Sequence, residues 1–205
     1  MADRQATPAS ITLENIAVVR GGRLVLQKFS LQVRAGDIIW LRGANGTGKS
    51  TLLRLIAGLL PAAAGDRQID GKIALVDDRL ALDSALSVEK ALGYWARMDG
   101  SSAQAQQDAL AAFDLANLAD IPVGYLSSGQ RKRAALARVL ASNADVWLLD
   151  EPYNGLDSAN AARLDGQLLK HAQSAGIAIV AAHQPASINV AATISLDEQR
   201  VNQTG

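Results

Sequence analysis

One run of eight residues constrains the fold of this chain more than any other part of it. The run matches the pattern G-x-x-x-x-G-K-[ST] and reads Gly43-Ala44-Asn45-Gly46-Thr47-Gly48-Lys49-Ser50. Glycines in such a run let consecutive backbone N–H groups curl around phosphate oxygens, and a following helix points its positive end at the same anion. The apolar segment 38–41 predicts a strand before the run, and the apolar spacing within 52–56 predicts a helix after it. The sequence therefore predicts a phosphate-binding loop at 43–50, called the phosphate loop below.

Two side chains of the phosphate loop suit nucleotide chemistry. We expect Lys49 to reach the β- and γ-phosphates and the Ser50 hydroxyl to ligate Mg²⁺. The alternative is an ordinary Gly-rich turn that caps a helix. The four fixed positions of the pattern coincide by chance in roughly one chain per hundred of this length, and the predicted strand and helix on either side argue further against chance.

Apolar and helical segments alternate along the rest of the chain. Continuous apolar runs predict strands at 38–41, 73–76, 146–149 and from 177, and helical spacing predicts helices at about 130–141 and 159–172. This alternation is typical of an α/β fold with a mainly parallel core sheet covered on both faces. Residues 11–33 predict two N-terminal antiparallel strands that turn at Gly21-Gly22, and residues 87–117 predict a helical insertion. We expect one domain, with a core at about 1–83 and 143–205 and a helical subdomain at about 84–142.

Composition excludes several classes of function. The 205 residues include no cysteine, which rules out thiol catalysis and Cys-ligated metal sites, and two histidines, which disfavours a His-rich metal site. Lys plus Arg (20) balance Asp plus Glu (20), so no global basic field exists to hold nucleic acid. The uncharged stretch 171–196 is longer than a membrane span, but polar residues and a proline interrupt it, which favours a buried strand in a soluble chain. The first residues lack the apolar segment of a secretory signal, so we expect no secretion.

A second motif, VWLLDE at 146–151, ends a predicted strand with two carboxylates. A continuous apolar run predicts a strand buried on both faces, and the C-terminal end of such a strand faces the crevice where α/β sheets bind ligands. Asp150 is therefore the expected Mg²⁺ partner of Ser50. Glu151 is the expected general base or water-orienting group for hydrolysis.

A third motif, LSSGQ at 126–130, has two interpretations. By itself it describes serines that cap a helix starting near Gln130, with the basic residues 131–133 on a solvated face. Together with the phosphate loop and the two carboxylates, it resembles the signature motif of the ATP-binding cassette (ABC) ATPases. The interpretations are compatible, because a capped helix N-terminus is also an anion site.

The resemblance to ABC ATPases extends over nearly the whole chain. Residues 154–157 (NGLD) are similar to the D-loop of the family, although Asn-Gly replaces the commoner Ser-Ala. His183 directly follows a predicted buried strand and is similar to the switch histidine that contacts the γ-phosphate. His171 lacks such a context, and we expect it at the surface.

Membership of this family implies that two cassettes sandwich two ATP molecules, so that each complete site exists only in the dimer. The resemblance implies catalysis by Lys49, Glu151 and His183, with ATP and Mg²⁺ bound. The implied nucleotide contacts are the phosphate loop, Thr51, Asp157 and, across the dimer, Ser127, Ser128, Gly129 and Gln130.

Two positions depart from the pattern of the family. The family commonly stacks adenine on an aromatic residue about 29 positions before the phosphate-loop lysine, and here that position is Arg20, whose guanidinium can also stack on a ring. The glutamine that usually follows the strand before the helical insertion is absent, and Asp78 aligns with it. We expect Asp78 to act near the Mg²⁺, and the alternative is that Asp78 caps a turn while Asp77, or no residue, fills the role.

Softer matches indicate one branch of the family. The short length, LLRLIAGLLP at 52–61, DIPV at 120–123, RKRAALAR at 131–138 and HQP at 183–185 resemble the ATP-binding subunit of the cytochrome c maturation system, often called the haem exporter. That branch implies integral-membrane permease subunits of the same system as partners, a homodimer of cassettes, haem export or handling, and a peripheral location at the cytoplasmic face of the inner membrane.

Four other functions remain open from the residues alone. The chain could serve another ABC importer or exporter, or be a non-transport ABC ATPase acting on nucleic acid or ribosomes, which usually carries long insertions or paired cassettes that are not seen here. A GTPase or small-molecule kinase is disfavoured by the signature motif and by the carboxylate pair. A regulatory subunit without turnover is disfavoured by the intact Lys49, Asp150, Glu151 and His183.

Overall fold

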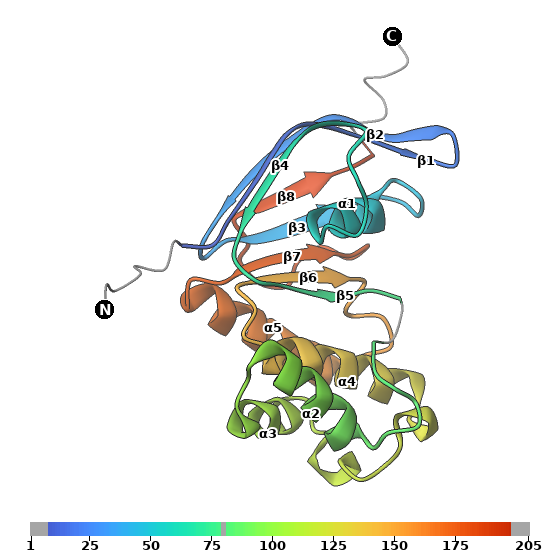
Figure 1. Cartoon of the computed structure of the whole chain (residues 1–205), viewed down its shortest axis with the longest axis vertical. Helices are drawn as coiled ribbons and strands as arrows, with labels where there is room; N and C mark the ends of the chain where they lie inside the picture. Colours follow the sequence, from blue (N-terminus) through green and yellow to red (C-terminus); the bar gives the residue numbers. More distant parts are fainter. Residues whose placement is uncertain (1–7, 79–80, 198–205) are drawn as a thin grey trace.

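A five-stranded parallel sheet forms the centre of the molecule (Figure 1), and four of its strands lie at the apolar runs that predict them. The computed structural model describes residues 8–78 and 81–197. The strands of this sheet, called the central sheet, lie in the order β5-β6-β7-β3-β8. Their bounds are β3 Ile38–Arg42, β5 Ile73–Val76, β6 Val146–Asp150, β7 Ile177–Ala181 and β8 Ala192–Ser195. Every residue of β6 and β7 is buried, which accounts for their continuous apolar sequences.

A second, antiparallel sheet has the order β2-β1-β4. The strands β1 (Ser10–Arg20) and β2 (Arg23–Arg34) form the predicted hairpin with its turn at Gly21-Gly22. The third strand, β4 (Ala64–Asp70), is not predicted by the sequence, because six of its seven residues are exposed and no apolar alternation marks it. Pairing with β1 makes it a strand. A Cβ on Gly65 of β4 would lie 2.3 Å from the carbonyl oxygen of Glu14, so only glycine fits this close crossing.

Two hydrophobic cores cover the two faces of the central sheet. Helix α1 (Lys49–Ile56) packs with the antiparallel sheet against the face that carries Ile39 and Leu41. The opposite face, which carries Trp40 and Trp147, packs against the remaining α-helices. Alternate residues of β3 thus enter different cores, as the period of a strand requires.

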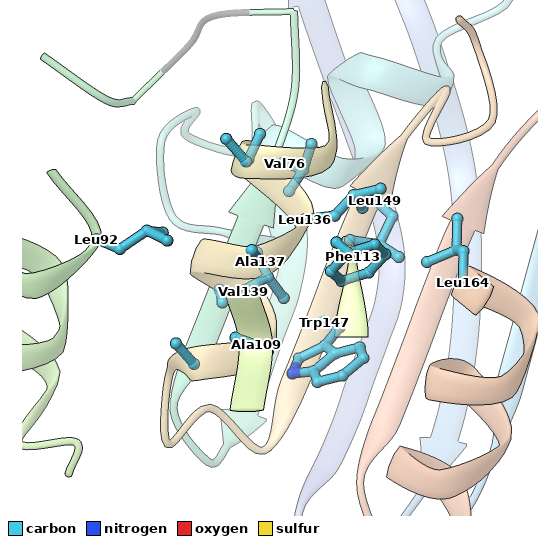
Figure 2. Packing of buried hydrophobic residues seen from close by; sticks show 14 of the residues in the cluster. Val76, Leu92, Ala109, Phe113, Leu136, Ala137, Val139, Trp147, Leu149 and Leu164 are labelled. Atoms are coloured by element: carbon cyan, nitrogen blue, oxygen red, sulfur yellow. The ribbon is translucent and has the colours of Figure 1, made fainter. Parts of the chain in front are cut away.

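The helices on the second face gather at one end of the molecule (Figure 1). Their bounds are α2 Val88–Asp99, α3 Ala103–Ala112, α4 Ser128–Ala141 and α5 Ser158–Gln173, with short 3₁₀ helices η1 (Ala116–Leu118) and η2 (Val123–Tyr125). Figure 2 shows Phe113 beside Leu136 of α4 and Leu149 of β6, so the helical insertion and the central sheet share one core. The division into a core and a helical subdomain therefore stays a prediction. No helix in the described ranges 8–78 and 81–197 is long and apolar enough to cross a membrane.

Candidate active site

The phosphate loop connects β3 to α1 at the C-terminal edge of the central sheet, as predicted. Gly48 is the N-cap of α1 and has a φ of 110°, a left-handed conformation that L side chains rarely adopt. A Cβ at this position would also lie 2.9 Å from the side chain of Val25 on β2. Glycine is therefore required here both by backbone conformation and by the close approach of β2.

The ammonium group of Lys49 lies inside the phosphate loop. Its Nζ donates a hydrogen bond to the carbonyl oxygen of Gly43 at 2.7 Å and lies 3.5 Å from Oε1 of Glu151. The side chain of Lys49 is 6% exposed. A positive charge thus stands ready where the loop would enclose phosphate oxygens.

Asp150 and Ser50, the last residue of the phosphate loop, provide oxygen atoms of the kind that bind Mg²⁺. Asp150 is the last residue of β6 and is buried, and its Oδ1 has no hydrogen-bond partner among the described residues. Burial raises the pKa of Asp150, and the hydrogen bond from Ser50 opposes that rise. An unpartnered buried carboxylate beside a hydroxyl fits Mg²⁺, which proteins usually hold through one or two carboxylates together with substrate phosphates.

The predicted catalytic residues converge from three segments. Nε2 of His183, which follows β7, lies 3.3 Å from Oε1 of Glu151 and donates to Oδ1 of Asn45 at 2.8 Å. Glu151 has a φ of 45°, which is uncommon for a residue with a side chain, and its N–H donates to the carbonyl oxygen of Ala181 on β7. The strand order places β6, β7 and β3 side by side, so the residues after each of them meet at one edge.

The structure places Asp78 beside an arginine. The guanidinium of Arg54 on α1 donates to Oδ1 of Asp78 at 2.5 Å and to Oδ2 of Asp77 at 3.1 and 2.9 Å. The Asp78 side chain is 78% exposed, although it lines the same pocket as Ser50 and Asp150. Arg54 is a site residue that the sequence analysis missed, because a basic residue in a helix is usually solvated.

Arg20 is not among the residues that line the pocket around the phosphate loop. The pocket around the loop has a volume of about 670 Å³ and includes Val25 of β2. Arg20 lines an adjoining cavity of about 580 Å³, which shares Arg54 and Asp77 with that pocket. The predicted stacking of Arg20 on adenine stays a prediction.

The signature residues begin α4, as the capping interpretation predicts. The Ser127 hydroxyl accepts a hydrogen bond from the N–H of Gln130 at 3.2 Å, and Oε1 of Gln130 accepts one from the N–H of Ser127 at 2.8 Å. Ser127 and Ser128 are exposed, and Ser128 lines the pocket of the phosphate loop. A Cβ on Gly129 would lie 2.7 Å from the carbonyl oxygen of Gly155, so α4 approaches residues 154–157 closely.

Asp157 is the N-cap of α5, where its Oδ1 accepts a hydrogen bond from the N–H of Asn160 at 2.8 Å. This bond lowers the pKa of the exposed Asp157 carboxyl. The implied contact of Asp157 with nucleotide stays a prediction.

The surface position expected for His171 is wrong. Its ring stacks on Trp147 with centroids 3.9 Å apart, and Nε2 lies 3.2 Å from the carbonyl oxygen of Ile177. Burial lowers the pKa of His171. A Cβ on Gly176 would lie 2.3 Å from this ring, so the glycine makes room for it.

Comparisons with known proteins agree on one family. The model of the ABC transporter family matches residues 26–154. The chain is 48% identical over 173 residues to the cytochrome c biogenesis ATP-binding export protein CcmA of Sphingopyxis alaskensis, covering 84% of this chain and 89% of that protein. It is 47% identical over 182 residues to CcmA of Novosphingobium aromaticivorans, covering 89% and 93% of the two chains.

Solved structures show the same fold. An ABC transporter ATP-binding protein from Pyrococcus furiosus superposes with a TM-score of 0.81 at 24% identity, covering 92% of this chain and 98% of the other. The dimeric structure of MJ0796, a bacterial ABC transporter cassette, gives a TM-score of 0.77 at 24% identity and covers 85% and 88%.

Proposed function

This chain belongs to the ABC transporter family as an ATP-binding subunit, and from that premise we propose that it powers a membrane complex of cytochrome c biogenesis. It is an ABC-type ATPase. The assignment to cytochrome c biogenesis, with haem as the exported or handled group, is supported by relatives named for that process at 37–48% identity.

The convergence of Lys49, Glu151 and His183 is the observation that carries the proposal for hydrolysis. Glu151 contacts both the Lys49 ammonium (3.5 Å) and Nε2 of His183 (3.3 Å). In the proposed reaction, water attacks the γ-phosphorus of ATP, Glu151 orients the water and accepts its proton, and ADP leaves. Lys49 and His183 stabilise the negative charge that develops on the phosphoryl oxygens.

We assign the Mg²⁺ that accompanies ATP to Ser50 and Asp150, with Asp78 as a third candidate ligand. Mg²⁺ would supply charge neutralisation of the phosphates. The buried, unpartnered Oδ1 of Asp150 supports this assignment, because a bound cation compensates the burial of its charge. Asp78 is held by Arg54 and would have to leave that partner to contribute.

Membership of the family implies dimeric cassettes and separate membrane permease subunits. We propose a head-to-tail homodimer in which Ser127 and Gly129 of one cassette face the phosphate loop of the other. The exposed position of Ser127 at the start of α4 supports this arrangement, because an uncovered helix N-terminus favours an anion. We further propose permease subunits of the cytochrome c maturation system as partners and a peripheral location at the cytoplasmic face of the inner membrane.

The test is complementation in a bacterium whose own gene for this subunit is deleted. The wild-type chain should restore cytochromes c with covalently bound haem, detected by haem staining of a denaturing gel. It should also co-purify with membrane subunits of the cytochrome c maturation system. The Glu151→Gln variant should co-purify with the same subunits but should not restore the cytochromes. Restoration of the transport of another substrate, with no cytochrome c, would instead identify the chain as the subunit of a different ABC importer or exporter.

A further inference from the structure

Five residues near Glu151 and His183 in the chain fold are joined by hydrogen bonds and a ring contact into one cluster, called the Asp165 cluster. Its members come from β3, from the segment after β6, from α5 and from the segment after β7: Trp40, Tyr153, Asp165, Gln184 and Ser187. None of these residues lines the pocket around the phosphate loop. The cluster is therefore separate from the groups that would touch nucleotide.

Asp165 on α5 is the centre of the cluster because both of its carboxylate oxygens accept hydrogen bonds. The Tyr153 hydroxyl donates to Oδ1 at 2.5 Å, and the Ser187 hydroxyl donates to Oδ2 at 2.6 Å. Hydroxyl donors to an ionised carboxylate at such distances are among the stronger hydrogen bonds in proteins. Burial raises the pKa of Tyr153, and the bond to Asp165 raises it further, so the phenol keeps the proton that it donates.

The other contacts of the cluster connect it to β3. The ring of Tyr153 packs on Trp40 with centroids 5.6 Å apart, and Nε1 of Trp40 donates to the carbonyl oxygen of Gln184 at 2.8 Å. Trp40 is 1% exposed and lies three residues before Gly43, the first residue of the phosphate loop. The cluster thus links both segments to a rigid strand of the central sheet.

Two catalytic residues stand directly on the segments that the cluster joins. Tyr153 lies two residues after Glu151, and Gln184 is the residue after His183. Residues 182–191 form no helix or strand, and backbone hydrogen bonds attach this segment to β3 at Ala182 and at Ala191. Between those two points, the bonds of Trp40 and Asp165 hold the segment in place.

We propose that Asp165 is a positioning residue for hydrolysis, which sets the separation of Glu151 and His183 by joining Tyr153 to Ser187. This inference rests on the proposed catalytic roles of Glu151 and His183. Catalysis depends steeply on such separations, because a misplacement of about 1 Å can cost about 100-fold in rate. Asp165 itself is not among the residues that line the pocket around the phosphate loop, and its hydrogen bonds go to Tyr153 and Ser187.

Steady-state hydrolysis and nucleotide binding by the full chain test the proposal. We expect Asp165→Ala to lower kcat by about 10- to 100-fold while the affinity for a fluorescent ATP analogue stays at the wild-type value. Asp165→Asn should restore most of kcat, because its amide oxygen can accept from Tyr153 and its amide N–H can donate to Ser187. Equal losses in the Ala and Asn variants, or a wild-type kcat in Asp165→Ala, would overturn the positioning role.

A matched control and one double variant distinguish positioning from a purely structural effect. Asp108 on α3 is another helical aspartate, bonded to Gln104 on its own helix, so Asp108→Ala should leave kcat unchanged. If Asp165→Ala does not fold, the double variant Tyr153→Phe with Ser187→Ala removes both donors and keeps the ring on Trp40. It should show the same loss of kcat at unchanged affinity, and a wild-type kcat would contradict the proposal.

An observable in the nucleotide-free protein separates positioning from chemistry. In two-dimensional NMR, the indole N–H signal of Trp40 should shift in Asp165→Ala, because its acceptor Gln184 moves. The signal of Trp95, whose indole N–H donates to Ala81 at 2.6 Å, should stay in place. An unshifted Trp40 signal would refute the linkage. Failure of the wild-type chain to hydrolyse ATP would instead refute the proposed function.

Discussion

At the scale of single residues, charge pairing decides which groups of the site are available to a metal. Asp150 is buried with an unpartnered oxygen, whereas Asp77 and Asp78 are both paired with Arg54. Two of these three carboxylates therefore have a direct cationic partner, and Asp150 has an oxygen that a metal ion can occupy. Arg54 on α1 is the cationic partner of both Asp77 and Asp78.

We predict that Asp78→Gln supports ATP hydrolysis at lower Mg²⁺ concentration than the wild type. The glutamine amide is neutral and forms no ion pair with Arg54. The side chain at position 78 can therefore move toward the metal without the free-energy cost of breaking that pair. Pairs this exposed are worth about 0.2–1 kcal/mol, which limits the shift of the Mg²⁺ midpoint to about fivefold. Titration of hydrolysis with Mg²⁺ measures it, with the exposed Asp66→Asn on β4 as control. Coinciding curves for the wild type, Asp78→Gln and Asp78→Ala would remove Asp78 from the metal site.

At the scale of elements, the close contact between α4 and residues 154–157 requires glycine at position 129, because any side chain there would meet the backbone of Gly155. A Cβ on Gly129 would lie 2.7 Å from a backbone oxygen, which cannot move aside as a flexible side chain would. Gly166 in α5 offers the opposite case, because a Cβ there meets nothing within 4 Å. Gly129 in α4 and Gly166 in α5 therefore allow a matched comparison of glycine-to-alanine substitutions.

We predict that Gly129→Ala lowers the free energy of unfolding by about 1–3 kcal/mol, the usual cost of overpacking. Gly166→Ala should raise it by about 0.5–1 kcal/mol, because alanine loses less backbone entropy than glycine in a helix. Urea unfolding monitored by circular dichroism gives both values. Equal stabilities of Gly129→Ala and the wild type would mean that α4 does not approach residues 154–157 so closely.

At the scale of the whole molecule, His171 makes the free energy of unfolding depend on pH. This residue lies at the end of the central sheet opposite the active site. His171 lies between Trp147 and Gly176, and burial lowers its pKa below that of the unfolded chain, while Asp145 partly offsets this effect. The unfolded chain therefore binds a proton at this residue before the native protein does. The stability that neutral His171 contributes is fully present above the pKa of the unfolded chain, about 6.5. It is lost as the pH falls toward the lower pKa of His171 in the native protein.

We predict that the stability of the wild type falls more steeply between pH 7 and pH 5 than that of His171→Phe, which keeps a ring on Trp147 but cannot bind a proton. Thermal unfolding at a series of pH values compares the two slopes. Parallel slopes would show that His171 does not contribute to the loss.

Assembly is a second property of the whole molecule. We predict that Glu151→Gln binds ATP but hydrolyses it about 10²- to 10⁴-fold more slowly, since the water-orienting carboxylate is lost. The uncleaved nucleotide should then hold two cassettes together, and size-exclusion chromatography with ATP should show a dimer. Full turnover with only monomer would contradict both the role of Glu151 and the sandwich arrangement.

Local pattern alone determined the parts of this protein that depend on nearby residues. The phosphate loop, the buried strand that ends in Asp150 and the cap of α4 at Ser127 were all predicted where the structure has them. Each is specified within a dozen residues, by glycine conformation, by continuous apolar sequence or by a capping side chain. The approach of Glu151 to the phosphate loop followed from the same patterns, because parallel strands bring their C-terminal ends to one edge. The place of His183 in the site came only from the resemblance to ABC ATPases.

Only the tertiary structure decided the features that depend on which distant segments meet. Strand β4 exists because β1 offers it hydrogen bonds, and its own polar sequence carries no sign of it. The same holds for the pairing of Arg54 with Asp78, for the stacking of His171 on Trp147 and for the bonds of Asp165. The side-chain partners in these last three cases lie between 12 and 24 residues apart along the chain, and the paired residues of β1 and β4 lie between 47 and 60 residues apart. The packing of helices on the central sheet brings them together, and packing of this kind leaves no periodic signature in the sequence.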